Sequence, residues 1–408
     1  MDKIRYLASD IAELCFPKHK MAFISGPRQC GKTTLAKHLL ADHNEGRYYN
    51  WDESKFRRLW AKDPSQISEG FPTNTTPLIV LDEIHKAKSW KRNLKGVYDT
   101  LTHAVDIIVT GSARLDIYRK GSDSLQGRYY GFRLHPFSLA ELLMQKCNTP
   151  EAVLDNLLNH NFHVNMEATK YLQLLDKFGP FPEPLLTADA RTLNLWRHTR
   201  ITKIIREDLR DLSRLPELSM IEMLIALLPE RAANVLSIQS LSEDLEVAYT
   251  TVKRWLNYLY QLYYAFKLPP YSKSLSRALK KESKLYLWDW SEIEDEGRRF
   301  ENLIASHLLK YCHYLTDTGI GDFQLYYLRN RQKQEIDFLV VKDKKPWLPI
   351  EVKLHDDTLA SNWSAFMRQL NCPYGVQVVK QDNVHQVVDT NFGKIVIISA
   401  AQFLSGLV

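Results

Sequence analysis

The chain has 408 residues, of which 45% are hydrophobic and 25% charged, and a formal net charge of +6. This length predicts roughly two to four domains, and so modest a charge permits a polyanionic partner without requiring one. No segment approaches the ~18 consecutive apolar residues of a membrane span, and the first residues lack a signal-peptide pattern. Five scattered cysteines without CxxC pairing argue against a disulfide framework and a structural zinc site. We therefore expect a cytoplasmic protein without a membrane partner.

Up to about residue 149, short apolar runs alternate with helix-like stretches. The runs occur in MAFIS, LIVLDEI and VDIIVTGS. Because they are continuous rather than alternating, they predict strands buried on both faces of a parallel sheet that helices cover. The sequence thus predicts an α/β domain over residues 1–149.

A phosphate-binding loop follows the first of these runs. The segment SGPRQCGKTT satisfies G-x-x-x-x-G-K-[ST] between a predicted strand and a predicted helix, which is the context that this motif requires. Its glycines let backbone N–H groups surround phosphates, Lys32 reaches the β and γ oxygens, and Thr33 offers its hydroxyl to Mg²⁺. The predicted ATP-binding residues are Gly26, Pro27, Arg28, Gln29, Cys30, Gly31, Lys32, Thr33 and Thr34.

The second apolar run ends in two acidic residues. Asp82 is expected to hold Mg²⁺ through water together with Thr33, and Glu83 to polarise the attacking water. An isolated acidic pair is also typical of a solvated strand end. Beside a phosphate loop, however, the pair favours a catalytic interpretation.

Three further residues are candidates for sensing or stabilising the γ-phosphate. Thr110 and Ser112 lie at the end of the third apolar run, where they either sense the phosphate or simply cap the strand end. Arg128 is a candidate arginine finger or γ-phosphate sensor, because a guanidinium stabilises charge that develops in phosphoryl transfer. A finger supplied in trans would require a homo-oligomer. An ordinary surface arginine is the alternative for Arg128.

The middle of the chain has a helical pattern over residues 150–230, interpreted as a lid or linker, and a winged-helix pattern over 231–292. Ser240 and Glu243 suggest a capping box, and the following segment TTVKRWLNYLYQLYY has one apolar helical face. Lys253 and Arg254 lie off this face, early in the predicted recognition helix. DNA is therefore the expected partner, and a winged helix that only packs domains together is the alternative. Phosphate contacts are expected from a basic wing containing Lys273, Arg277, Lys280, Lys281 and Lys284.

The last part, residues 293–408, contains an acid–acid–lysine set. Asp337 lies on one predicted strand, and Glu351 and Lys353 share one face of the next. Two carboxylates from paired strands can hold Mg²⁺ or Mn²⁺, while a neighbouring lysine activates water or steadies the phosphate. Glu301, on a helix upstream, would complete the metal site. Such a pattern is also common on solvated strand faces.

Taken together, these motifs resemble a known family. GPRQCGKTTL, VLDEIHK, VTGSA and SLQGRYYGFRLHPFSLAEL are similar to the bacterial and archaeal AAA-type ATPases whose C-terminal half has a restriction-endonuclease-like core. The resemblance extends to FGPFPEPLL and ITKIIREDLRDLS, and it implies ATP binding. Cys30 departs from the β-branched residue that is more common there. The C-terminal set resembles the PD-(D/E)xK nuclease superfamily, although Ile336 replaces the usual proline.

The sequence therefore predicts an α/β multidomain protein with three parts: a P-loop AAA-type ATPase, a helical and winged-helix middle, and a restriction-endonuclease-like domain. The leading functional hypothesis is ATP-dependent binding or processing of DNA, with ATP hydrolysis and metal-dependent nuclease activity. The alternative is an ATP-switched regulatory protein whose nuclease-like domain is an inactive docking surface.

Overall fold

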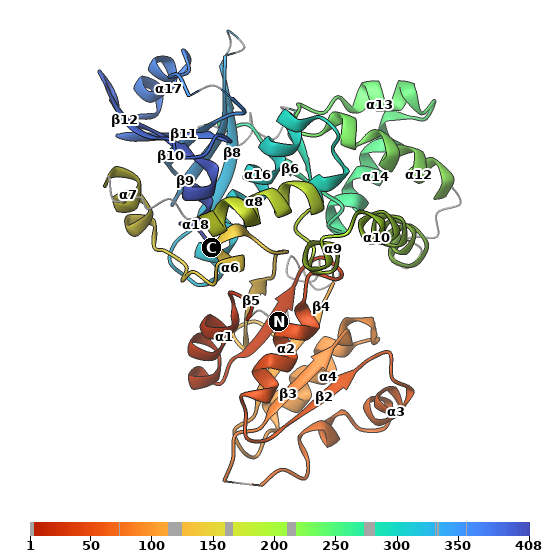
Figure 1. Ribbon diagram of the computed structural model, residues 1–408. Helices are drawn as coiled ribbons and strands as arrows, with labels where there is room; N and C mark the ends of the chain where they lie inside the picture. The colour runs from red at the N-terminus through yellow and green to blue at the C-terminus, as the bar shows by residue number, and fades with distance from the viewer. Residues whose placement is uncertain are drawn as a thin grey trace. The chain divides into compact units, whose positions relative to one another are not determined.

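The computed structural model describes residues 4–72, 74–112, 125–159, 166–209, 218–272, 282–330, 332, 334–355 and 357–408. It divides into two compact units, Met1–Pro136 and Phe137–Val408 (Figure 1). The finer division into four domains stays a prediction. No helix among the described residues is both long and apolar enough to span a membrane.

Unit 1 contains a five-stranded sheet in the order β2-β3-β4-β1-β5, and every neighbouring pair is parallel. Every residue of β1, β3 and β4 is buried, which explains their continuous apolar sequences. The predicted parallel sheet is confirmed. The strands are β1 (Met21–Ser25), β2 (Gly46–Asn50), β3 (Leu78–Asp82), β4 (Asp106–Gly111) and β5 (Tyr129–Arg133).

Helices connect these strands. A core cluster that includes Phe56, Trp60 and Trp90 packs against β1, β3 and β4, and the ring of Phe23 stacks on that of Tyr129 at 4.1 Å. The connecting elements are α1 (Ala8–Leu14), η1 (Phe16–Lys18), α2 (Lys32–Ala41), α3 (Ser54–Lys62), η2 (Pro64–Ser68), η3 (Ile84–Lys86) and α4 (Trp90–Asp99). Because all five strands are parallel, their carboxyl ends form one edge, where the loop after β1 meets the ends of β3 and β4.

The first part of unit 2 is helical. It contains α6 (Leu139–Leu142), α7 (Pro150–Leu158), α8 (Met166–Phe178), α9 (Pro182–Thr187), α10 (Ala190–Lys203), a π-helical stretch η5 (Ile204–Leu209), α12 (Leu218–Leu227) and η6 (Pro229–Arg231). A buried ion pair of 2.6 Å between Lys310 and Glu141 ties α6 to the later helix α16 (Glu296–Asp317). The described residues of 150–230 are thus mainly helical, as their pattern predicted.

Two helices and a two-stranded antiparallel sheet follow: α13 (Ile238–Asp244), α14 (Tyr249–Gln261), β6 (Ala265–Leu268) and β7 (Lys284–Leu287). The predicted capping box is wrong, because α13 begins three residues earlier and Ser237 accepts the N–H of Ser240. Glu243 instead accepts a side-chain hydrogen bond from Gln239 at 2.7 Å. The apolar face of α14 is buried as expected.

The rest of unit 2 is a six-stranded mixed sheet in the order β12-β13-β11-β10-β9-β8, and α16 lies against β8 (Figure 1). The pairs β10–β11 and β11–β13 are parallel, and the other three are antiparallel. A tight turn with positive φ at Asp343 and Lys344 joins β9 to β10, at the predicted hairpin. The elements are η7 (Trp290–Glu292), β8 (Phe323–Arg329), β9 (Glu335–Lys342), β10 (Lys345–Lys353), α17 (Trp363–Leu370), β11 (Tyr374–Val379), β12 (His385–Thr390), β13 (Gly393–Ser399) and α18 (Ala400–Ser405).

Candidate functional site

The loop between β1 and α2 has the backbone that a phosphate site needs. Gly26, Gln29 and Gly31 have φ of 155°, 60° and 100°, which turn successive backbone groups toward one side. A Cβ on Gly26 would overlap the backbone carbonyl of Leu134, so only glycine fits there. The buried thiol of Cys30 lies 3.5 Å from the same carbonyl oxygen. Cys30 thus packs beneath the loop, consistent with its tolerance at this position.

Lys32 begins α2 and its side chain folds over the loop. Its ammonium donates to the carbonyls of Gly26 at 3.0 Å and Pro27 at 2.6 Å, and the residue is buried. The buried guanidinium of Arg5 donates to the carbonyl of Cys30 and to that of His135. Arg5 therefore supports the loop from the N-terminal segment. No pattern in the sequence marks this contact, because it joins residues that are far apart along the chain.

Asp82, at the carboxyl end of β3, accepts hydrogen bonds from hydroxyl groups on three elements. Its Oδ2 accepts from Thr33 at 2.9 Å and from Tyr48 at 2.5 Å. Its Oδ1 accepts from Thr110 on β4. Burial and the hydrogen bond to Asp82 raise the pKa of Tyr48, so this phenol remains protonated. Sequence reasoning missed Tyr48, because β2 lacks an apolar run.

The two predicted Mg²⁺-binding residues of unit 1, Thr33 and Asp82, are thus in direct contact. The hydroxyl of Thr33 and the carboxylate of Asp82 supply the hard oxygen ligands that Mg²⁺ prefers, and they lie next to the phosphate loop. These residues fit the ion. Thr110 contacts Asp82, so its role as a phosphate sensor stays a prediction, and Ser112 is buried just beyond β4. Among the other loop residues, Thr34 is exposed and Arg28 is half-buried.

Glu83 follows Asp82 with a strained backbone, at φ 58°. Burial raises the pKa of its carboxyl group, while the charges of Lys32 and Lys86 oppose that shift. Its Oε2 lies 3.5 Å from Nε2 of His85 and 3.8 Å from Nζ of Lys86. A carboxylate held here with a raised pKa suits a general base.

Arg128 lies away from the phosphate loop. It precedes β5 and its carbonyl accepts the N–H of Met21, the first residue of β1, so it is at the amino-terminal edge of the sheet. Its guanidinium pairs with both oxygens of Asp99, at 2.6 and 2.9 Å. A γ-phosphate contact within one chain is therefore wrong for Arg128, because the strand separates it from the loop. A finger supplied in trans stays a prediction.

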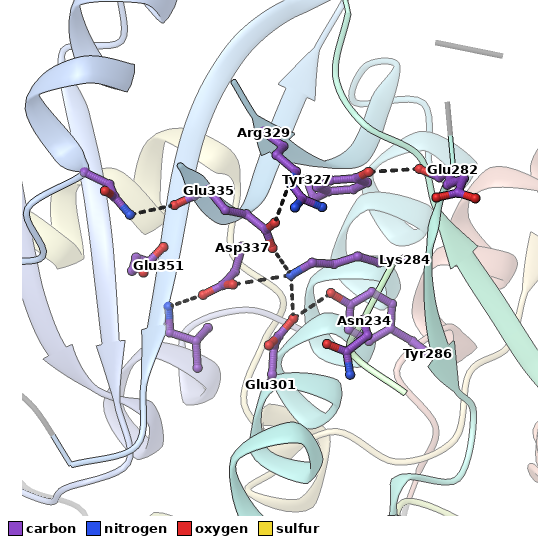
Figure 2. A network of polar contacts seen from close by, with 12 residues as sticks. Asn234, Glu282, Lys284, Tyr286, Glu301, Tyr327, Arg329, Glu335, Asp337 and Glu351 are labelled. Carbon is purple, nitrogen blue, oxygen red and sulfur yellow. Dashed lines mark hydrogen bonds and ion pairs between the residues drawn. The ribbon is translucent and has the colours of Figure 1, made fainter. Parts of the chain in front are cut away.

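In unit 2, the side chain of Lys284 on β7 lies at the centre of an acidic cluster (Figure 2). Its ammonium is 3.0 Å from Oε1 of Glu301 on α16, 2.5 Å from Oε1 of Glu335 and 3.5 Å from Oδ1 of Asp337, both on β9. Lys284 is only 4% exposed. Burial alone would lower its pKa, but the three carboxylates outweigh burial and raise it. The lysine therefore carries its charge inside the cluster.

Neighbouring groups hold this cluster in place. The hydroxyl of Tyr286 donates to Oε1 of Glu301 at 2.8 Å, and the side-chain amide of Asn302 bonds both the N–H and the carbonyl of Leu287 at 2.8 Å. Burial and the charge of Asp337 raise the pKa of Glu301 to about 7. The strand β7 is thus fixed against α16.

The predicted acid–acid–lysine set lies on the paired strands β9 and β10, where Lys353 pairs with Glu351 and Asp337 has a backbone partner. The backbone N–H of Val352 donates to Oδ2 of Asp337 at 2.9 Å, and Lys353 donates to Oε1 of Glu351 at 2.7 Å. Glu351 is 4% exposed, and its Oε2 has no hydrogen-bond partner among the described residues. Burial, followed by the charge of Asp337, raises its pKa to about 7.

The three predicted metal ligands are not gathered into one group in this structure. No group of three or more His, Cys, Asp or Glu residues able to hold a metal ion occurs in the described part of the chain. Lys284 stands among Glu301, Glu335 and Asp337, and Glu351 lies apart from it (Figure 2). The metal-binding assignment of Glu301, Asp337 and Glu351 stays a prediction, and a buried ammonium neutralises part of the cluster's charge.

The same contacts correct the role of Lys284 as a phosphate-binding wing residue, because a side chain buried among carboxylates cannot reach a DNA backbone. The other expected wing residues, Lys273, Arg277, Lys280 and Lys281, lie outside the described residues. Lys253 and Arg254 are exposed on α14.

Comparison with known families agrees with the geometry of the phosphate loop. Residues 18–143 match the family model described as an AAA domain. The region that contains the phosphate loop is thus similar to an AAA domain. Residues 170–291 and 296–402 match two models described as domains of unknown function, DUF8612 and DUF4143. The expected winged-helix and restriction-endonuclease-like folds therefore stay proposals.

Similar chains are known from archaea and bacteria. An uncharacterised protein of Methanocaldococcus jannaschii is 23% identical, over 97% of this chain and 88% of its own length. A second from that organism is 26% identical, over 72% of this chain and 69% of its own. An uncharacterised protein of Mycobacterium tuberculosis is 22% identical, over 80% of this chain and 69% of its own length.

Two solved structures are similar at low scores. The Walker-type ATPase paby2304 of Pyrococcus abyssi has a TM-score of 0.40 and 14% identity, over 69% of this chain and 92% of that one. AMPPCP-bound DnaA from Aquifex aeolicus has a TM-score of 0.30 and 13% identity, over 62% of this chain and 85% of that one. At these TM-scores neither likeness supports an inference about this chain.

Proposed function

We propose that unit 1 binds ATP with Mg²⁺ and hydrolyses it. The contact of 2.9 Å between the Thr33 hydroxyl and Asp82 carries this proposal, because both groups adjoin the phosphate loop. Lys32 would exchange the carbonyls of Gly26 and Pro27 for phosphate oxygens. Bound Mg²⁺ would neutralise charge that develops on the phosphates. Glu83 would accept a proton from the attacking water.

Two variants separate binding from chemistry. We expect Lys32→Ala to weaken ATP binding by about tenfold or more, because the ammonium–phosphate attraction is lost. We expect Glu83→Gln to bind ATP normally but to lose about 100-fold or more in turnover, the usual contribution of a general base. Nucleotide binding and phosphate release measure the two effects. Lys55→Ala, an exposed residue of α3, is the control. Equal turnover by wild type and Glu83→Gln would exclude the assigned base.

For unit 2 we propose DNA binding without cleavage. The exposure of Lys253 and Arg254 next to the buried Val252 and Trp255 supports a recognition helix in α14. The order α16, β8–β10, α17, β11 is consistent with a nuclease-like core. Turnover is disfavoured, because Lys284 lies where the cluster would need a metal ion. The nuclease-like domain would then act as an inactive docking surface that ATP regulates.

Binding and cutting of duplex DNA can be measured on the same samples. We expect affinity that falls steeply with salt, because phosphate contacts release counterions, and at least a several-fold weaker complex for Lys253→Ala/Arg254→Ala. We expect no cutting of linear or supercoiled DNA with ATP and Mg²⁺ or Mn²⁺. Salt-independent or absent binding would sink the DNA proposal. Cutting that disappears in Asp337→Ala would instead establish a nuclease.

A further inference from the structure

The acidic cluster around Lys284 has the form of a cation site. Three carboxylates from two elements, α16 and β9, converge on one buried nitrogen at 3.0, 2.5 and 3.5 Å (Figure 2). Such convergence of like charges is unfavourable unless a cation lies among them. The cation here belongs to the chain itself.

We infer that the Lys284 ammonium is the resident cation of this cluster and takes the place of the divalent metal ion that a nuclease-like fold implies. This inference rests on the proposed absence of turnover in unit 2, but it concerns occupancy of the cluster rather than cleavage. The lysine then occupies the cluster and its ion pairs hold β7 against α16 and β9.

The backbone around Lys284 keeps its side chain in place. Lys284 pairs with Leu268 on β6 and forms a bridge to Val235. Three residues further along β7, Asn302 of α16 bonds both backbone groups of Leu287. The backbone of Lys284 is therefore fixed between two neighbouring segments, which keeps the base of its side chain beside the carboxylates.

Two carboxylate oxygens of the cluster also have further partners. Oε1 of Glu301 accepts from both Lys284 and Tyr286, and Oδ2 of Asp337 accepts the N–H of Val352. A divalent ion among these oxygens would lie within a few ångströms of a fixed positive charge in a buried region, where electrostatic repulsion is strong. Metal and lysine are thus mutually exclusive occupants.

The test is a Mn²⁺ titration of the full-length, nucleotide-free protein, followed by electron paramagnetic resonance of free Mn²⁺. The wild-type protein should have no Mn²⁺ site that is lost in the Asp337→Asn variant. Lys284→Met, which keeps the length but removes the charge, should gain one Mn²⁺ at least roughly tenfold tighter than any wild-type site. The gain should vanish in Lys284→Met/Asp337→Asn. Lys353→Met, whose lysine contacts Glu351 instead, is the matched control and should gain none.

Thermal unfolding gives a second readout. Lys284→Met should unfold at a lower temperature than wild type, and Mn²⁺ should raise the Tm of this variant but not that of wild type. Wild-type Mn²⁺ binding that depends on Asp337 would overturn the inference, as would a folded Lys284→Met that gains no ion. If Lys284→Met does not fold, the wild-type titration alone decides. DNA cutting without Asp337-dependent Mn²⁺ binding would refute the absence of turnover and leave the inference standing.

Discussion

At the carboxyl end of β3, the carboxylate of Asp82 accepts hydrogen bonds from the hydroxyl groups of Thr33, Tyr48 and Thr110. Asp82, Thr33 and Thr110 were predicted near the nucleotide, whereas Tyr48 was not. Lys284 is the clearest reversal at the residue scale. Its position in a basic tract predicted a phosphate contact, whereas the fold surrounds it with carboxylates. Local charge pattern alone therefore does not decide the partner of a charged side chain.

Glu351 carries a prediction about pH. Burial and the charge of Asp337 raise its folded-state pKa to about 7, above the ordinary value of about 4.3. Below pH ~4 the residue is protonated in both states and contributes nothing; between about pH 4 and pH 7 only the unfolded state ionises, which lowers the free energy of unfolding. Glu351→Gln should therefore stabilise unit 2 by about 2–3 kcal/mol more at pH 8 than at pH 5.

Urea unfolding of unit 2 at both pH values measures this difference. Glu294→Gln removes an exposed carboxylate of the same unit and is the control. A Glu351→Gln effect of the same size at pH 5 and pH 8 would show that the carboxylate ionises freely in the folded protein.

At the scale of elements, the loop between β1 and α2 was predictable from its motif, because phosphate geometry dictates its glycines. The start of α13 was not predictable. Ser237 and Ser240 are both good N-cap residues, and the helix begins after the first of them. The hairpin β9–β10 was predicted, whereas its pairing through β10 to the parallel strand β11 depends on residues distant in the sequence.

Two glycines of unit 1 test the loop. A Cβ on Gly26 would overlap the carbonyl of Leu134 at a φ of 155°, so Gly26→Ala should destabilise unit 1 by about 1–3 kcal/mol and weaken ATP binding. A Cβ on Gly96, in the exposed face of α4, would meet nothing within 4 Å. Gly96→Ala should therefore stabilise the unit by about 0.5–1 kcal/mol. Urea unfolding and ATP titration of the two variants measure these effects. If Gly26→Ala and Gly96→Ala changed stability and ATP binding equally, the close approach at Gly26 would be contradicted.

At the scale of the whole molecule, the chain divides after Pro136, and each unit has its own sheet. The parallel sheet of unit 1 was predictable, because strands buried on both faces have continuous apolar sequences. The long helical region before α13 gave no comparable signal of where one unit ends. The expected domain boundary at residue 149 stays a prediction.

The sequence by itself determined the phosphate loop, the acidic residue Asp82 beside it and the sheet that presents them, because local motif and hydrophobic pattern encode these features. Only the tertiary structure decided which charged groups meet. It placed Arg128 at the opposite edge of the sheet, Arg5 beneath the loop and Lys284 among the acids of unit 2. The physical reason is that electrostatic partners are set by distance in space, and these partners come from elements far apart along the chain.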